Sequence, residues 1–259
     1  MTVRTIEYRN GSQEMMDSWP EGCWIPCPAA EEAIPSTPST ARRSQPIATE
    51  DTTSEQGWKR PEPSPEDLLR AAGEISPSTL ARAKDAIIER TSEFLEIAKD
   101  LELSRMDAGR ARDLARALSL MQIGYLPVRP ETCPFCIQYG HDGHCIGCGY
   151  ARTHGRCDED SSAFSLFIEA FQELGSAIFL DRCTTAPADF RKSLQRSLDG
   201  SFGLAQRMIE DLPGASVNGM MELKRYYIHD MIDILPLDLL SPEVFEKAVV
   251  VQEALDSYW

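Results

Sequence analysis

Residues 133–157 read CPFCIQYGHDGHCIGCGYARTHGRC, and this stretch decides how the chain is organised. Five of the eight cysteines and three of the four histidines fall within it. Cys133 and Cys136 form one C-x-x-C pair, and Cys145 and Cys148 form a second pair after eight intervening residues. A C-x-x-C turn lets two thiolates converge on one ion, and two such turns can supply a tetrahedral four-sulfur site. The spacing therefore predicts metal binding.

The first expectation is a closed structural zinc site on both pairs. The spacing is similar to that of zinc-ribbon knuckles, although this similarity covers only about a tenth of the chain. Pro134 stiffens the first turn, and Gly149 directly follows the second pair, where a tight turn can need a glycine. The expected ligands of the Zn²⁺ ion are Cys133, Cys136, Cys145 and Cys148.

A fifth thiol, Cys157, leaves the ligand set open. An iron–sulfur cluster of the 4Fe-4S type also takes four thiolates. Such a cluster would be served equally well by Cys133, Cys136, Cys148 and Cys157. Three histidines are possible alternate ligands or hydrogen-bond partners of the ligands. They are His141, His144 and His154.

Both sides of the cysteine-rich stretch have a helical pattern. Apolar residues recur every third or fourth position from Ser76 to Leu101, and again from Ser104 to Gly124, which predicts two helices joined as an antiparallel hairpin. Four further helices are expected, and Ser241 and Pro242 are a typical start for the last of them. The four lie within residues 164–180, 187–212, 220–235 and 241–259.

The fold class expected from these patterns is all-α. Roughly six helices form a domain over residues 67–259, with a small zinc-ribbon-like module inserted at residues 130–158. Residues 1–66 contain nine of the 17 prolines among Ser, Thr and Glu, and we expect a disordered tail there. Within it, the apolar residues around Cys23 and Cys27 could order on a partner.

Charge and hydropathy limit the partners and the compartment. With 41 acidic and 26 basic side chains, the net charge of −15 argues against general nucleic-acid binding. The most apolar stretch, residues 163–180, carries two glutamates, and we expect no membrane span and no signal peptide. The protein is placed in the cytoplasm, where thiols are kept reduced and clustered cysteines bind metals more often than they form disulfides.

Three functions fit this sequence. The leading one is a cytoplasmic, acidic, non-catalytic zinc protein that acts through protein–protein contacts, since the chain contains none of the common catalytic motifs. The alternative is an iron–sulfur protein with an electron-transfer or enzyme-accessory role. The third is a zinc enzyme with an open site of mixed Cys and His ligands, in which one thiolate is dispensable for metal retention.

Overall fold

The computed structural model describes residues 64–259, apart from residue 102 and the segments 104–106, 141–144 and 183–187. The predicted tail, with Cys23 and Cys27, therefore lies outside the described residues up to residue 63. The alternate ligands His141 and His144 lie outside them as well. The described residues belong to one compact unit.

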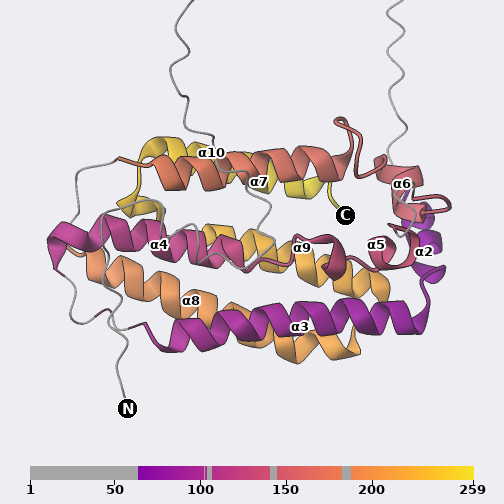
Figure 1. The fold of residues 1–259 in the computed structure, drawn as a ribbon, viewed down its shortest axis with the longest axis horizontal. Coiled ribbons are helices and arrows are strands. Elements are labelled where there is room, and N and C mark those ends of the chain that lie inside the picture. Colours follow the sequence, from indigo (N-terminus) through magenta and orange to yellow (C-terminus); the bar gives the residue numbers. More distant parts are fainter. Residues whose placement is uncertain (1–63, 102, 104–106, 141–144, 183–187) are drawn as a thin grey trace, which may run out of the picture. The chain divides into compact units, whose positions relative to one another are not determined.

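The described residues are mostly helical and contain no strand, which confirms the all-α class (Figure 1). Six helices correspond to the six that the sequence predicts. They are α3 (Pro77–Lys99), α4 (Ala111–Gly124), α7 (Ala163–Leu180), α8 (Phe190–Asp211), α9 (Val217–Asp233) and α10 (Pro242–Asp256). Three short helices raise the count in the described part to nine, so a total of about six was too low. They are α2 (Pro65–Gly73), α5 (Pro134–Tyr139) and α6 (Gly149–His154).

Serine caps explain where several helices begin. The hydroxyl oxygens of Ser76, Ser162 and Ser216 each accept a hydrogen bond from the backbone N–H three residues later, at the starts of α3, α7 and α9. Such a bond satisfies one of the N–H groups that a helix start leaves without an intrahelical acceptor. Ser241 and Pro242 also start α10 as expected, although the Ser241 side chain makes no cap hydrogen bond.

The long helices pack in a different order from the one the sequence predicts. α3 packs mainly on α8, and α4 packs on α7 and α8, so the two predicted hairpin partners do not lie against each other along their lengths. They meet at the end of α4, where Arg90 of α3 donates to the carbonyl oxygens of Gly124 and, at 3.1 Å, Leu126. The reason is that α8 is long and has an extensive buried face, which takes the place of the expected direct contact.

α7 and α10 pack side by side (Figure 1). In the described part of the chain, α7 alone is long and apolar enough to cross a membrane by the criteria of length and composition. Helices in the core of soluble proteins meet the same criteria, and 33% of α7 is buried by the rest of the protein. Arg116 of α4 also binds the end of α7, donating to the carbonyl oxygen of Ile178 at 3.2 Å.

The cysteine-rich stretch is folded as helices and turns. α5 packs against α3, and α6 packs against α2, so the short helices gather at one end of the long ones (Figure 1). Cys133 and Cys148 are the N-cap residues of α5 and α6, and Pro134 at the first position of α5 favours helix there. A zinc-ribbon-like shape is therefore not confirmed for residues 130–158, since their described part forms two six-residue helices.

Candidate metal centre

All five cysteines of the stretch 133–157 are described, and all five are free thiols. Cys133 and Cys148 are buried, whereas the other three are partly exposed. Cys136 lies in α5, Cys145 precedes the turn into α6, and Cys157 follows α6. The fold thus brings thiols from both sides of α6 towards α5.

The second C-x-x-C pair forms a tight turn. The N–H of Cys148 donates to the carbonyl oxygen of Cys145 at 3.0 Å, and Gly147 has a φ of 81°, in the region that favours glycine. The Sγ atom of Cys148 in turn accepts a hydrogen bond from the N–H of Ala151 at 3.5 Å. A backbone N–H directed at sulfur stabilises the thiolate form, which is the form that binds metals.

Cys157 lies beside the first pair. The Cys133 thiol donates a hydrogen bond to Cys136, and this bond, together with burial, raises the pKa of Cys133 well above its usual range. The bond from Cys133 lowers the pKa of Cys136, but the bond that Cys136 makes with Cys157, together with burial, raises it to about 12. Three thiols therefore form a hydrogen-bonded chain in the order Cys133, Cys136, Cys157.

Cys148 lies close to Cys133 and also to Cys145, the other member of its own pair. Burial is the main cause that raises the pKa of Cys148, and the charge of Cys133 is a further cause. Tyr150 has its pKa raised first by burial and then by four nearby thiols. These four thiols are Cys157, Cys133, Cys136 and Cys148. Tyr150 thus has around it the same four cysteines that the sequence proposed as iron–sulfur ligands.

A buried lysine, Lys224, faces the thiols from α9. Its side chain is only 1% exposed, and burial lowers its pKa, while the charges of Cys133, Cys136 and Cys157 act in the opposite direction. Its ammonium group also lies 5.5 Å from the centre of the Tyr258 ring. This residue was not predicted from the sequence, although Lys224 stands four residues after Met220 and seven before Met231 on the apolar stripe of α9. A lysine on such a stripe is a signal for a buried charge with a partner.

Aromatic rings gather near the thiols, towards the end of α10. The rings of Tyr150 and Trp259 are parallel within 3°, with centres 6.2 Å apart, and Phe135 packs 5.8 Å from each of them. His154 stacks on Tyr150 with ring centres 4.3 Å apart, and its Nδ1 atom is 2.7 Å from the Thr153 hydroxyl oxygen. Burial lowers the pKa of His154. The ring of this alternate ligand is therefore held by stacking and by Thr153.

The distances between possible ligand atoms show which side chains lie close enough together to share one metal ion. Within the described residues, one group of three or more His, Cys, Asp or Glu side chains has its ligand atoms all within 4.8 Å of one another: His229, Asp230 and Asp233. This group lies on α9, with Nδ1 of His229 at 3.5 and 3.4 Å from the two carboxylates, and it is largely exposed. No three of the five cysteine sulfurs come this close together in the part of the chain that is described.

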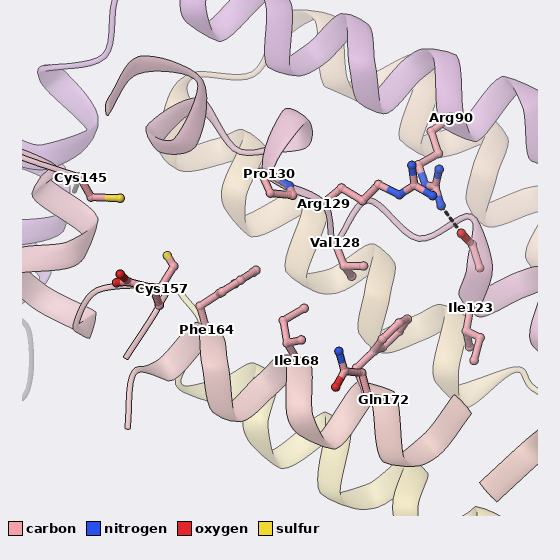
Figure 2. A pocket seen from close by; sticks show the side chains of 13 residues that line it. Arg90, Ile123, Val128, Arg129, Pro130, Cys145, Cys157, Phe164, Ile168 and Gln172 are labelled. Atoms are coloured by element: carbon pink, nitrogen blue, oxygen red, sulfur yellow. Dashed lines mark hydrogen bonds between the residues drawn. The ribbon is translucent and has the colours of Figure 1, made fainter. Parts of the chain in front are cut away.

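A cavity of about 390 Å³ lies beside the thiols (Figure 2). Cys145 and Cys157 line it together with apolar side chains of α4 and α7 and two arginines. Figure 2 shows Cys145 and Cys157 on one side of the cavity and the guanidinium groups of Arg90 and Arg129 on the other. The thiols thus border a space large enough for a small molecule.

Comparisons of the chain with protein-family models, with curated proteins and with solved structures find no match.

Proposed function

We propose that this chain holds an iron–sulfur cluster on Cys133, Cys136, Cys148 and Cys157. The observation that carries the proposal is the position of Cys157 beside Cys136, close enough to raise the pKa of Cys136, which joins the fifth thiol to the first pair. A closed site on the two C-x-x-C pairs has no use for Cys157. A cluster ligated by the other set accounts for that residue and leaves Cys145 outside.

The chemistry of the donors fits a metal centre. Burial keeps the thiols of Cys133 and Cys136 protonated at neutral pH, helped at Cys133 by its bond to Cys136 and at Cys136 by Cys157, so they are poor nucleophiles for redox exchange. A bound cation would displace these protons, since the thiolate is the metal ligand. Four thiolates around such a centre leave it negatively charged, and the buried ammonium of Lys224 supplies a compensating charge.

The separation of the sulfurs bears on both metal centres. With Zn–S bonds of about 2.3 Å, a tetrahedral zinc site places its sulfurs about 3.8 Å apart. A cubane cluster holds its thiolates farther apart because each one binds a different iron atom. No three of the described cysteine sulfurs lie within 4.8 Å of one another, so either centre would have to rearrange the thiols when it binds.

Structural zinc on Cys133, Cys136, Cys145 and Cys148 is the second candidate. The observation in its favour is the turn from Cys145 to Cys148, in which Gly147 has a positive φ and the Cys148 sulfur accepts an N–H. This local geometry suits a zinc knuckle. Binding there would require the two pairs to close on one ion without Cys157.

In either case the centre would connect parts of the fold that are distant in sequence. Lys224 brings α9 to the thiols, and the Tyr150 hydroxyl donates to the carbonyl oxygen of Tyr258 at 3.0 Å, which joins α6 to the end of α10. An electron-transfer or enzyme-accessory role is the function that a buried cluster supports. A zinc centre would instead be structural and would leave the protein to act through a protein partner, in the cytoplasm and without a catalytic role.

The test uses two matched variants, C157S and C145S, purified without oxygen. Iron, zinc and acid-labile sulfide are measured together with the visible spectrum. We expect the wild-type protein and C145S to be brown and to contain iron and sulfide, and C157S to lose both. Folding of each variant is followed by far-ultraviolet circular dichroism.

The opposite pattern would overturn the cluster. One zinc per chain without colour, lost in C145S and kept in C157S, would establish the second candidate. Protein without zinc or iron, after loading under reducing conditions, would contradict both. A variant of one cysteine that keeps its zinc but loses an enzymatic activity would favour the open zinc enzyme instead.

A further inference from the structure

The cavity beside the thiols has mostly apolar walls. Ile123 and Val128 line it from the end of α4 and the segment after it, and Phe164, Ile168 and Phe171 line it from α7. Its volume of about 390 Å³ is at the small end of the range for ligand sites. This volume suits the apolar body of a small organic molecule and is tight for a dinucleotide.

One buried donor beside the cavity has no acceptor. The Nη2 atom of Arg129 is buried and makes no hydrogen bond within the described residues, and the whole side chain is only 13% exposed. Its Nη1 atom lies 3.7 Å from a Glu131 carboxylate oxygen, which is too long for a hydrogen bond. Leaving a buried guanidinium N–H unsatisfied is costly, so a small shift of the Arg129 side chain towards the cavity, where a ligand supplies an acceptor, would be favourable.

A second guanidinium lies at the same end of the cavity. The Arg90 side chain is fixed by the carbonyl oxygens of Gly124 and Leu126 and lies over the Tyr125 ring at 5.4 Å. Figure 2 shows its charged group next to that of Arg129. Two neighbouring positive groups repel each other, and an anion between them would relieve this repulsion.

The acidic residue in the lining does not neutralise these two positive charges. Asp158 lines the cavity too, but its carboxylate pairs with Arg156 at 2.6 Å. The apolar side chains then lie between a positively charged end and the end formed by Cys145 and Cys157.

From this arrangement we infer that the cavity binds an organic monocarboxylate with an apolar body. The carboxylate accepts hydrogen bonds from Arg129 beside Arg90, and the body lies along α7 towards the thiols. Arginine is well suited to this role because its planar donor fork matches a carboxylate. The inference goes beyond the proposed function, because neither arginine belongs to the metal centre.

Isothermal titration calorimetry of the full chain with decanoate tests the inference. Decanol has the same tail with a neutral head, and acetate has the head without the tail. We expect decanoate to bind at least about tenfold more tightly than either control, because binding needs both the charge and the apolar contact. Equal affinity for decanol would overturn the assigned carboxylate, and an absence of decanoate binding would overturn the site.

Variants localise the binding. R129Q removes the unsatisfied donor and should weaken decanoate binding about tenfold or more, whereas R207Q removes an exposed charge on α8 and should leave it unchanged. A Cβ at Gly124, which lines the cavity, would meet no atom within 4 Å. G124L should therefore fill the space without a clash near the backbone and abolish binding while the protein stays folded.

Two results would contradict the inference. Decanoate affinity that is the same in R129Q as in R207Q, or unchanged in G124L, would show that decanoate binds elsewhere. Metal content measured on the same samples separates this result from the outcome for the cluster, since the arginine end of the cavity does not depend on the cysteines.

Discussion

The ammonium group of Lys224 donates to both oxygens of Thr132, at 3.4 Å to the carbonyl and 3.3 Å to the hydroxyl. Thr132 directly precedes Cys133, so this contact fixes the start of the first cysteine pair to the middle of α9. The Thr132 hydroxyl in turn donates to the carbonyl oxygens of Pro127 and Arg129, both at 2.7 Å. The buried lysine, the approach to α5 and the thiols thus form one connected polar group within the core.

Replacing this lysine should have opposite effects with and without metal. K224M keeps much of the side-chain volume but removes a buried charge. In the metal-free protein, where the thiols are protonated, we expect unfolding free energy that is unchanged or higher. In the loaded protein, the negative charge of the thiolates is then uncompensated, and the affinity for the metal should fall about 10- to 100-fold. Chemical denaturation and chelator competition measure the two effects, with K247M as the exposed control.

Equal destabilisation of the loaded and metal-free forms of K224M would contradict this view. It would mean that Lys224 acts through packing and its bonds to Thr132, independently of the thiols. The control is suitable because Lys247 pairs with Glu173 at the surface.

The stability of the metal-free protein should fall at alkaline pH. The pKa of Cys136 is raised to about 12, whereas an unfolded thiol titrates near 8.5. A raised pKa in the folded state gives stability that is complete below about pH 8.5 and is lost as the pH rises towards the folded value. For each such thiol the loss reaches about 1.4 kcal/mol per pH unit. Denaturation from pH 7 to 10 measures it.

The variant C136S provides the comparison for the pH series. It lacks the thiol whose pKa is raised, so its stability should fall less steeply above pH 8.5. Metal-loaded protein should not show the decline, because its ligands are already thiolates. A decline of equal slope in the wild type and C136S would contradict the placement of this thiol.

Gly149 is the point where α6 approaches α2 most closely. A Cβ at this position would lie 2.4 Å from the Cβ and 2.9 Å from the Cα of Ala71. G149A should therefore push α2 away and cost about 1–3 kcal/mol of unfolding free energy. Because Gly149 follows Cys148, it should also weaken metal retention.

Gly203 provides the matched control for this substitution. It lies within α8, and a Cβ there would meet no atom within 4 Å. G203A should raise the unfolding free energy by about 0.5–1 kcal/mol, since alanine favours helix over glycine. The midpoint temperature of thermal denaturation should thus fall in G149A and rise in G203A. A shift in the same direction in both would contradict the close contact at Gly149.

Tyr258 should be far more important for stability than its position after the last helix suggests. Its side chain is only 2% exposed and packs 5.4 Å from the Phe167 ring, close to Lys224. Y258A should cost about 3–5 kcal/mol, the range for removing a large buried aromatic side chain. F245A in α10 removes a ring that is 56% exposed and should change the free energy by less than about 0.5 kcal/mol. Urea denaturation compares the two, and similar losses would contradict the burial of Tyr258.

Much of the secondary structure could be predicted from local patterns. The start of α10 was predicted from Ser241 and Pro242, because capping depends on neighbouring residues, and apolar periodicity from Ser76 onward located α3. α5 and α6 were missed because six residues are too few to show a helical period, and their starts depend on Cys133 and Cys148.

The sequence by itself determined the helical class and the set of five clustered thiols, since apolar periodicity and cysteine spacing are local properties. Only the tertiary structure decided which side chains surround those thiols. Lys224 lies 91 residues beyond Cys133 in the chain, Tyr258 lies farther still, and α8 separates two helices that are neighbours in sequence. These neighbours are chosen by how apolar helix faces pack against one another, and that depends on the whole chain at once.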